Sequence, residues 1–509
     1  MRLNIVIGGR AGHGINKVSS IVSKVLVKYG YFTFNYRDYQ SLIRGGHSFN
    51  NLSISDTPIL SHESKMDIIV ALDKKTPEIH KHTLKKEGII ITEEKLKSER
   101  QNLNIAMAGA LLKILGIPLE LLTEELKVQF KKSDEIIASG KRGYESQNEK
   151  LKLEKLDNKI SILSGSEAVA IGARNSNLDL YIAYPMTPST NAMHAMAKNQ
   201  VENKLMVFQA ENEISVINTA LGASFAGAKT LIGTSGGGFD LMTEGLSFQG
   251  ISKIPLTVYL ASRAGPGTGV PTYTSQADLD IALRGGHGEF PRIVVAPATP
   301  NENIEKISEA LFLSEKFKSL SIVLSDKHLA ESEFSELEQP KKDIKKYNIS
   351  RKVPGTSIIK ASSYESDHLG NSTESYTLTE KNSNKRLEIY EKEKEYVLEN
   401  FETTKIHGKK TSKNLIIGWG STSGAIIDAI KGLDAKFLQV IYMKPLSPQI
   451  KKEMQKAKNI ILVECNLTGQ LGRLIREKTG LKIKNRLLKY NGRPFHSDEL
   501  NNLLKNMLI

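Results

Sequence analysis

The sequence has 509 residues, enough for three domains of roughly 150 residues each. Apolar residues make up 39% and charged residues 25%, as in ordinary globular proteins, and no run of about 20 apolar residues favours a transmembrane helix. The net charge is +14, but the lysines are scattered and no nucleic-acid-binding motif accompanies them. We therefore expect neither nucleic acid nor a membrane as a partner.

The single cysteine, Cys465, ends an apolar run and is expected in the core. One cysteine excludes a disulfide within the chain and also a chain-autonomous iron–sulfur cluster, which usually takes four thiolates. The first residues resemble a strand that runs into glycines and lack the features of a signal peptide. We expect a cytoplasmic protein.

Short apolar runs alternate along the chain with segments of helical length. Runs that are apolar on both faces and separated in this way favour parallel sheets covered by helices. The pattern predicts the α/β class, with three separate, mainly parallel sheets. The runs are residues 3–7, 67–72 and 88–92, then 180–183, 205–209, 229–233, 254–261, 292–296 and 321–324, and finally 414–418, 436–442 and 459–463.

Two polar stretches, 131–157 and 332–412, separate these three groups of strands. They place domains at 1–150, 160–330 and 412–509, with an extended connector over 331–411. Within the connector, residues 380–399 are dense in Lys and Glu, which predicts an exposed helix with charged pairs.

A glycine-rich segment, residues 8–14, follows the first apolar run. Glycines between a strand and a helix let backbone N–H groups approach a phosphate, although Arg10 and Ala11 depart from the G-x-G-x-x-G pattern. A tight turn is the alternative. Residues 43–48, Ile-Arg-Gly-Gly-His-Ser, could likewise meet a phosphate or a partner, or form a turn. The glycines of the first segment are Gly8, Gly9, Gly12 and Gly14.

The segment 184–190 reads Tyr-Pro-Met-Thr-Pro-Ser-Thr and follows an apolar strand. Its hydroxyl groups, among them that of Thr187, lie at the carboxyl end of a strand, where open α/β sheets bind ligands. The alternative is that Ser189 or Thr190 caps the following helix.

Two charged residues stand at the ends of later strands. Glu211 ends an apolar strand, so we expect its carboxylate to be partly desolvated and its pKa raised. The alternative is a first-turn glutamate favoured by the helix dipole. Arg263 begins a Gly/Pro-rich loop and is placed to hold a carboxylate bidentately, or else to make a structural salt bridge.

Two rival functions remain open. Residues 233–237 fit G-x-S-x-G, and Ser235, Asp278 and His287 follow in the order of a serine hydrolase, although no upstream His-Gly-Gly-Gly segment is present. A non-catalytic scaffold could instead bind an acidic partner through its basic surface. No metal site is predicted, because no second His or Cys stands at suitable spacing from His287.

These segments resemble the 2-oxoacid:ferredoxin oxidoreductase family, in the form in which gamma and alpha portions are fused. Residues 1–150 resemble the gamma portion. Residues 160–330 resemble the alpha catalytic domain, a pyrimidine-type thiamine-diphosphate-binding fold, through the Tyr-Pro-x-Thr-Pro-Ser signature at 184–189 and Gln-Ala-Glu at 209–211. Residues 412–509 resemble a transketolase C-terminal-like domain, through 418–421 and 469–471.

The resemblance implies an alpha subunit of an enzyme that oxidatively decarboxylates a 2-oxoacid to its acyl-CoA and reduces ferredoxin, with 2-oxoglutarate favoured over pyruvate. It implies that Glu211, with Tyr184 and Pro185, contacts thiamine diphosphate, and that Thr187 and Arg263 hold the substrate carboxylate. The glycines of residues 8–14 would help to bind coenzyme A.

The chain lacks features that this chemistry requires. No Gly-Asp-Gly segment, which holds the diphosphate through Mg²⁺, occurs in it, and the cysteines for a cluster are absent. The resemblance implies that a beta subunit supplies Mg²⁺ and a [4Fe–4S] cluster. The chain would then work only in a heterodimer or heterotetramer.

Overall fold

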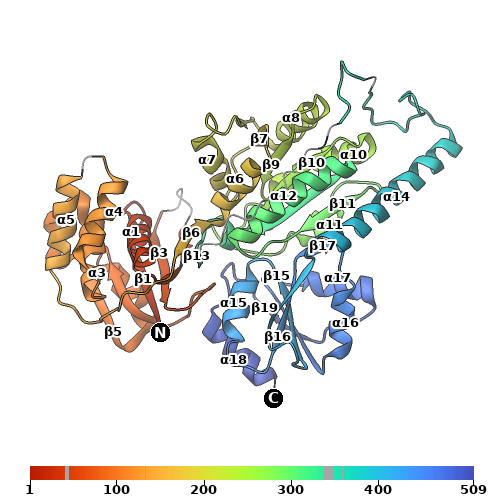
Figure 1. The fold of residues 1–509 in the computed structure, drawn as a ribbon. Helices are drawn as coiled ribbons and strands as arrows, with labels where there is room; N and C mark the ends of the chain where they lie inside the picture. Colours follow the sequence, from red (N-terminus) through yellow and green to blue (C-terminus); the bar gives the residue numbers. More distant parts are fainter. Residues whose placement is uncertain (41–44, 132, 338–348, 350, 358, 509) are drawn as a thin grey trace. The chain divides into compact units, whose positions relative to one another are not determined.

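The computed structural model describes residues 1–40, 45–131, 133–337, 349, 351–357 and 359–508 (Figure 1). The chain divides into two compact units. The first contains Met1–Leu163, Ser332–Lys341 and His496–Leu504, and the second contains Ser164–Glu331, Lys342–Phe495 and Lys505–Ile509. Both are built from sheets and helices, so the predicted α/β class is confirmed. The domain boundaries given above stay a prediction.

The first unit contains a seven-stranded sheet in the order β5-β4-β1-β3-β2-β13-β6. The pairs β1–β4 and β4–β5 are parallel, but β3 runs antiparallel to both β1 and β2. This sheet is therefore mixed, because the short link between β2 and β3 leaves no room for the crossover helix that parallel pairing of these two strands would need. The strands are β1 (Arg2–Arg10), β2 (Phe32–Asp38), β3 (His47–Ser55), β4 (Met66–Ala71), β5 (Leu84–Thr92), β6 (Ile160–Ser164) and β13 (Glu333–Leu337).

Helices of the first unit pack on this sheet through apolar side chains. The buried face of α1 includes Val18, Val22 and Val25, which join one core cluster with strand residues such as Ile5 and Ile68. The helices are α1 (Ile15–Lys28), α2 (Lys75–His80), α3 (Leu103–Ile114), α4 (Leu119–Gln129) and α5 (Asp134–Glu145).

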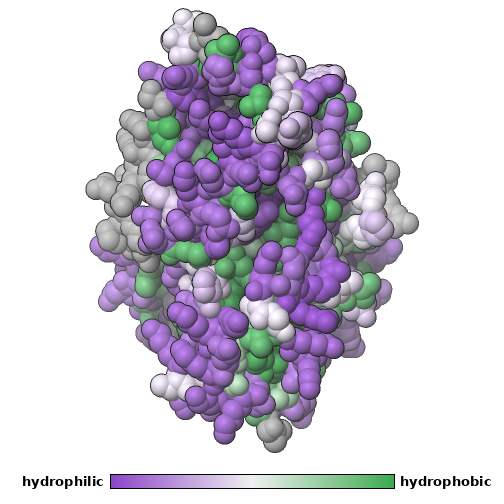
Figure 2. Space-filling view, turned by 90° about the vertical axis from the view of Figure 1, so that its right-hand side faces the viewer, coloured by the Kyte–Doolittle hydropathy of each residue, from purple (hydrophilic) through white to green (hydrophobic). Residues whose placement is uncertain are grey.

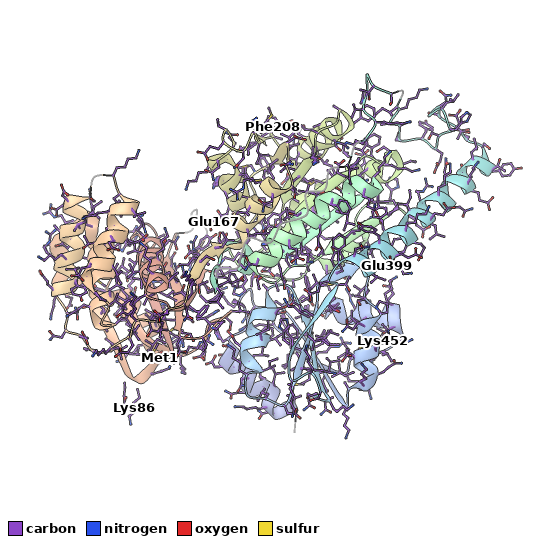
Figure 3. All side chains as sticks on the ribbon, viewed as in Figure 1. Met1, Lys86, Glu167, Phe208, Glu399 and Lys452 are labelled. Atoms are coloured by element: carbon purple, nitrogen blue, oxygen red, sulfur yellow. The ribbon has the colours of Figure 1, made fainter. Side chains whose placement is uncertain are left out.

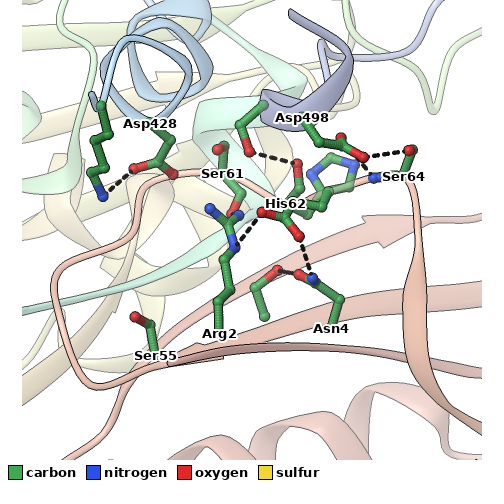
Figure 4. Close-up of polar contacts among 12 residues, drawn as sticks. Arg2, Asn4, Ser55, Ser61, His62, Ser64, Asp428 and Asp498 are labelled. Atoms are coloured by element: carbon green, nitrogen blue, oxygen red, sulfur yellow. Dashed lines mark hydrogen bonds and ion pairs between the residues drawn. The ribbon is translucent and has the colours of Figure 1, made fainter. Parts of the chain in front are cut away.

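Two segments distant in sequence complete the first unit. Strand β13 pairs with β2, with Phe334 opposite Phe34. Helix α18 (Ser497–Met507) begins beside the loop that follows β3, where Asp498 accepts hydrogen bonds from the backbone N–H and the hydroxyl of Ser64 (Figure 4). Strand β13 thus lies within the stretch 331–411.

The second unit contains a sheet in the order β17-β11-β12-β10-β9-β7-β8, in which the pairs from β11 to β8 are all parallel. Its strands are β7 (Leu180–Ala183), β8 (Met206–Gln209), β9 (Thr230–Thr234), β10 (Leu256–Ser262), β11 (Arg292–Val295), β12 (Leu320–Asp326) and β17 (Tyr442–Lys444). Its helices are α6 (Gly165–Asn175), α7 (Thr190–Lys198), α8 (Glu213–Phe225), α9 (Gly236–Leu241), α10 (Thr243–Ser252), α11 (Leu279–Arg284), α12 (Pro300–Phe317) and α13 (Lys327–Glu331).

The second unit also contains a five-stranded sheet in the order β14-β16-β15-β18-β19. Only β14 is antiparallel to its neighbour. The run predicted at 436–442 divides, and its end forms β17, which pairs antiparallel with β11 of the larger sheet. The elements are β14 (Thr404–Gly408), β15 (Asn414–Trp419), β16 (Lys436–Val440), β18 (Asn459–Glu464), β19 (Asn485–Leu488), α15 (Thr422–Ala429), α16 (Gln449–Lys456) and α17 (Gln470–Thr479).

The helix predicted over 380–399 is confirmed as α14 (Tyr376–Asn400). It is not exposed throughout, because Glu393 and Val397 are buried. Along the described part of the chain, no helix combines the length and apolar character needed to cross a membrane.

Candidate functional site

The larger sheet of the second unit has a switch point between β7 and β9. The chain passes from β7 through α7 to β8 on one side, then through α8 to β9 on the other side of β7. Ala183 lies opposite both Gln209 and Gly233, and Leu260 lies opposite Thr234, so the carboxyl ends of four strands are level. Open α/β sheets bind ligands at such an edge.

The loop after β7 carries the predicted residues Tyr184, Pro185 and Thr187. Tyr184 is 38% exposed, whereas Pro185 and Thr187 are partly buried. The hydroxyl of Ser189 donates to the carbonyl oxygen of Met186 at 2.8 Å and does not cap the helix that follows. The structure therefore does not support Ser189 as a helix cap, and its hydroxyl closes the loop instead.

Arg263 follows β10 and reaches this loop. Its Nη1 donates to the carbonyl oxygen of Thr187 at 3.2 Å, so two residues predicted from different strands lie together. Burial lowers the pKa of the guanidinium. Within the described ranges no carboxylate lies within 4.0 Å of it, which contradicts the structural salt bridge. Most of its donors stay available for an incoming anion.

Glu211 differs from expectation. It lies between β8 and α8, is exposed to solvent, and accepts a hydrogen bond from the hydroxyl of Ser215. This bond holds the pKa of Glu211 below its usual value. The expected desolvation and raised pKa are therefore wrong for the isolated chain, because the strand ends before Glu211 and the side chain points away from the core.

Glu213, which the sequence analysis did not single out, is a buried carboxylate at this edge. It is the first residue of α8 and only 4% exposed. A Cβ added at Gly238 would lie 2.9 Å from Glu213 Oε1 and 2.3 Å from Thr234 Oγ1, so only glycine fits there. The helix N-terminus favours a negative charge at this position. The glycines of residues 233–238 were the signal in the sequence for such a residue, because a run of glycines indicates that another group approaches the backbone closely.

Asp278 lies on the same edge, where a Cβ at Gly236 would approach its Oδ2 to 2.6 Å. Burial raises the pKa of Asp278 to about 6. Asp278 Oδ2 and the hydroxyl of Ser235 are both buried without a hydrogen-bond partner. Buried polar atoms rarely lack a hydrogen-bond partner. A group bound at this edge would supply the missing partners.

The serine hydrolase arrangement is not assembled. Ser235 is completely buried and its hydroxyl has no partner, whereas His287 is exposed and its backbone N–H donates to Ser247. A nucleophile needs a base within hydrogen-bond reach. Ser235, Asp278 and His287 do not form that chain, so the hydrolase interpretation is wrong.

In the first unit, the loop of the glycine segment begins later than its sequence pattern indicates. Gly8 and Gly9 are buried within β1, paired with Phe49 and Ser48, and only the residues after Arg10 form the loop. Gly12 and Gly14 have φ of +95° and +76°, which favour glycine. Residues 43 and 44 of the second glycine segment lie outside the described residues.

His47 lies against this glycine segment and contacts His80. His47 Nε2 is 2.8 Å from His80 Nε2, and a Cβ at Gly8 would meet the His47 ring. Burial lowers the pKa of His80 to about 4. In the part of the chain that the structure describes, no group of three or more His, Cys, Asp or Glu side chains is arranged to hold a metal ion.

Two family models match the chain. Residues 171–403 match the family described as "Pyruvate flavodoxin/ferredoxin oxidoreductase, thiamine diP-bdg", and residues 4–103 match "Pyruvate ferredoxin/flavodoxin oxidoreductase". The first match covers β7, β8, β9 and β10 with the loops that follow them.

Curated relatives match along almost the whole chain. A 2-oxoacid:ferredoxin oxidoreductase subunit alpha from Saccharolobus solfataricus is 30% identical, over 99% of this chain and 98% of that protein. One from a Sulfolobus species is 29% identical, over 99% and 96%. A solved 2-oxoglutarate:ferredoxin oxidoreductase from Magnetococcus marinus, with 2-oxoglutarate, coenzyme A and succinyl-CoA bound, matches with a TM-score of 0.89 at 25% identity, over 100% of both chains.

Proposed function

Because the chain belongs to the family of 2-oxoacid:ferredoxin oxidoreductase alpha subunits, we propose that the edge between β7 and β9 forms the pyrimidine side of its thiamine diphosphate site. The enzyme oxidatively decarboxylates a 2-oxoacid to its acyl-CoA and reduces ferredoxin. The main support for this proposal is that three residues from different strand ends, Thr187, Glu213 and Arg263, lie at the switch point.

The residues at this edge fit the aminopyrimidine end of the cofactor. Glycines at 236 and 238 let Asp278, Thr234 and Glu213 approach the backbone closely, and the unpartnered oxygens of Ser235 and Asp278 lie at the same edge. When bound, thiamine diphosphate supplies a thiazolium carbon that attacks the keto group and an electron sink for the decarboxylation. Tyr184 and Pro185 would complete the wall of the site on the β7 side.

Glu213 is better placed than Glu211 to hold the pyrimidine ring nitrogen. A carboxylate on that nitrogen must be shielded from water, since a solvated one gains little from the contact. Glu213 is buried and lies at a helix N-terminus, which stabilises its charge. Glu211 is exposed and bonded to Ser215. The assignment to Glu211 remains the alternative.

Arg263 and Thr187 would hold the substrate carboxylate. Desolvation of the guanidinium without a carboxylate partner is a cost that a bound carboxylate would offset through charge-assisted hydrogen bonds. The substrate proposed is 2-oxoglutarate, with pyruvate as the alternative. Its support is the similarity to the Magnetococcus marinus enzyme solved with 2-oxoglutarate and succinyl-CoA.

The remaining components would come from elsewhere. No Gly-Asp-Gly segment occurs in the sequence and only one cysteine does, so we propose that a beta subunit contributes Mg²⁺ and the [4Fe–4S] cluster, in a heterodimer or heterotetramer in the cytoplasm. Ferredoxin would accept the electrons. The loop with Gly12 and Gly14, in a gamma-type domain over 1–150, would help to bind coenzyme A through its backbone N–H groups.

The test compares Glu213→Gln with Glu211→Gln in the complex co-expressed with the beta subunit. Loss of a general acid–base contact typically costs about 10²–10⁴-fold in rate. We expect that loss in kcat with 2-oxoglutarate for Glu213→Gln, and wild-type kcat for Glu211→Gln. Thiamine diphosphate affinity, measured by titration calorimetry, provides a readout independent of turnover.

The reverse result, a loss only for Glu211→Gln, would return the role to Glu211. Wild-type turnover and cofactor affinity in both variants would place the cofactor away from this edge. Arg263→Lys adds a check on the substrate side, because a lysine cannot reproduce the fork of the guanidinium. It should raise KM for the 2-oxoacid and leave cofactor affinity unchanged.

A further inference from the structure

The second unit has a cavity of about 460 Å³, a volume within the range of small-molecule sites. None of its lining residues belongs to the sheet edge described above. The lining residues come from α11, α14, α17 and the segment that contains β17: Leu283, Arg284, Tyr390, Glu391, Lys394, Met443, Lys444, Pro445, Leu446, Leu474, Glu477 and Lys478. Figure 2 shows the right-hand side of Figure 1, where α14 and α17 are labelled and an apolar strip runs between hydrophilic surfaces.

The lining is positively charged. Four cationic side chains and two acidic ones give the walls a net charge of +2. The two acids are already engaged, because Glu391 pairs with Lys394 at 2.8 Å, and Glu477 pairs with Arg284 and Lys478. Lys444 is the lining cation that takes part in none of these ion pairs. No carboxylate of the described residues lies within 4.0 Å of its Nζ.

Lys444 is surrounded by like charge. Its Nζ lies 5.3 Å from the centre of the Tyr390 ring, and Arg292, only 4% exposed, stands on the neighbouring strand β11. Burial, together with Arg292, Lys478 and Arg284, lowers the pKa of Lys444 to about 8. Glu393 attracts it, but burial raises the pKa of that carboxyl to about 8 as well, so it carries little charge near pH 7.

A protein that places a half-buried cation among other cations gains from an anion bound there, because the anion reduces both the desolvation penalty and the repulsion. The charge of +2 matches a dianion better than a carboxylate. Leu283, Met443 and Leu474 provide apolar walls for the remainder of a ligand. A phosphate monoester on a compact apolar or aromatic body has both properties.

We propose that this cavity is a second binding site, distinct from the catalytic edge, for an organic phosphate monoester of the nucleoside monophosphate kind, with Lys444 as the principal anchor. Arg284, Lys394 and Lys478 contribute donors to the phosphate oxygens, as cationic side chains do in phosphate sites generally. Occupancy of the site would depend on the charged phosphate.

The test is titration calorimetry on the full chain in complex with its beta subunit, with AMP, adenosine and inorganic phosphate as probes. We expect AMP to bind at least about tenfold more tightly than adenosine, since charge-assisted hydrogen bonds contribute on the order of 1.5–3 kcal/mol. Inorganic phosphate should compete with AMP. The proposal would be overturned if AMP did not bind, or if AMP and adenosine bound with equal affinity.

Variants locate the site. Lys444→Gln should weaken AMP binding about tenfold or more, and Lys394→Gln gives a second, more exposed position if Lys444→Gln fails to fold. Lys452→Gln is the matched control, because Lys452 is an exposed lysine on α16 outside the cavity (Figure 3). Equal AMP affinity in wild type, Lys394→Gln and Lys444→Gln would place the ligand elsewhere and contradict the assignment.

Discussion

Glu211 and Glu213 are two residues apart, yet one is exposed and the other buried. Helix α8 begins at Glu213 and has Asn212 as its cap, so the direction of each carboxylate follows from where the helix starts. Both glutamates follow the same apolar strand. A strand pattern indicates where the strand ends but not which later side chain turns inward, and this explains the mistaken burial of Glu211.

At the same scale, Asp278 should make stability depend on pH. Its folded pKa of about 6 lies above the usual 3.8, so the folded state binds the proton more tightly and ionisation costs stability. The cost is absent below about pH 4, grows towards pH 6, and amounts at most to about 3 kcal/mol above it. Asp278→Asn should therefore raise Tm, more at pH 8 than at pH 5.

The control for this measurement is Glu289→Gln, since Glu289 is exposed on the turn that contains His287. It should leave Tm unchanged at both pH values. A Tm gain of Asp278→Asn that is the same at pH 5 and pH 8 would show that the carboxylate is not held in its protonated form by burial.

At the scale of elements, β8 is the edge strand of the larger sheet and ends beside the proposed site. Its side chains Met206 and Phe208 are 64% and 43% exposed, and Ile214 of the following helix is 52% exposed. Figure 3 labels Phe208 at the outer part of its unit. Exposed apolar side chains on an edge strand favour a protein partner, here the proposed beta subunit.

Phe208→Asp should therefore abolish association with the beta subunit and leave the chain itself folded. An exposed substitution changes stability by less than about 0.5 kcal/mol, whereas an unpaired charge within a partner contact costs several times more. Co-purification and the Tm of the isolated chain separate the two effects. Val128→Asp, at a 78% exposed position on α4, is the control, and retained association of Phe208→Asp would exclude β8 from the contact.

At the scale of the whole molecule, the proposed function divides the reaction between this chain and a beta subunit. No described cluster of carboxylate, imidazole or thiolate side chains is arranged for a metal, and the single cysteine is buried. Burial raises the pKa of Cys465 above its usual range, so it does not ionise near neutral pH. Under the proposed function, Mg²⁺ and the cluster would come from the partner chain.

This dependence gives a metal-removal prediction. EDTA treatment of the complex, followed by gel filtration, should strip thiamine diphosphate and abolish turnover, and added Mg²⁺ with the cofactor should restore both. The Tm of the isolated chain should not respond to EDTA. A lower Tm of the isolated chain in EDTA would reveal a divalent cation held by this chain and contradict the division of roles.

The sequence by itself determined where the strands formed by short apolar runs lie, because such runs between helix-length segments are typical of sheets covered by helices; each predicted run overlaps a strand, with 436–442 divided between β16 and β17. Burial on both faces does not hold for β5 and β8, which are largely exposed. The sequence also placed Thr187 and Arg263 in the loops after two such runs, and the structure brings these two loops into contact. The strands it missed, such as β2 and β3, mix polar with apolar residues and carry antiparallel pairing that no local pattern specifies.

Only the tertiary structure decided which strands are neighbours. The switch point between β7 and β9, the contact of Arg263 with the Thr187 carbonyl, and the burial of Glu213 against Gly238 all depend on that order. The same holds for β13 and β17, which join sheets far from them in sequence. Pairings of this kind depend on packing between distant segments, and the physical signal for them is absent from any short stretch of sequence.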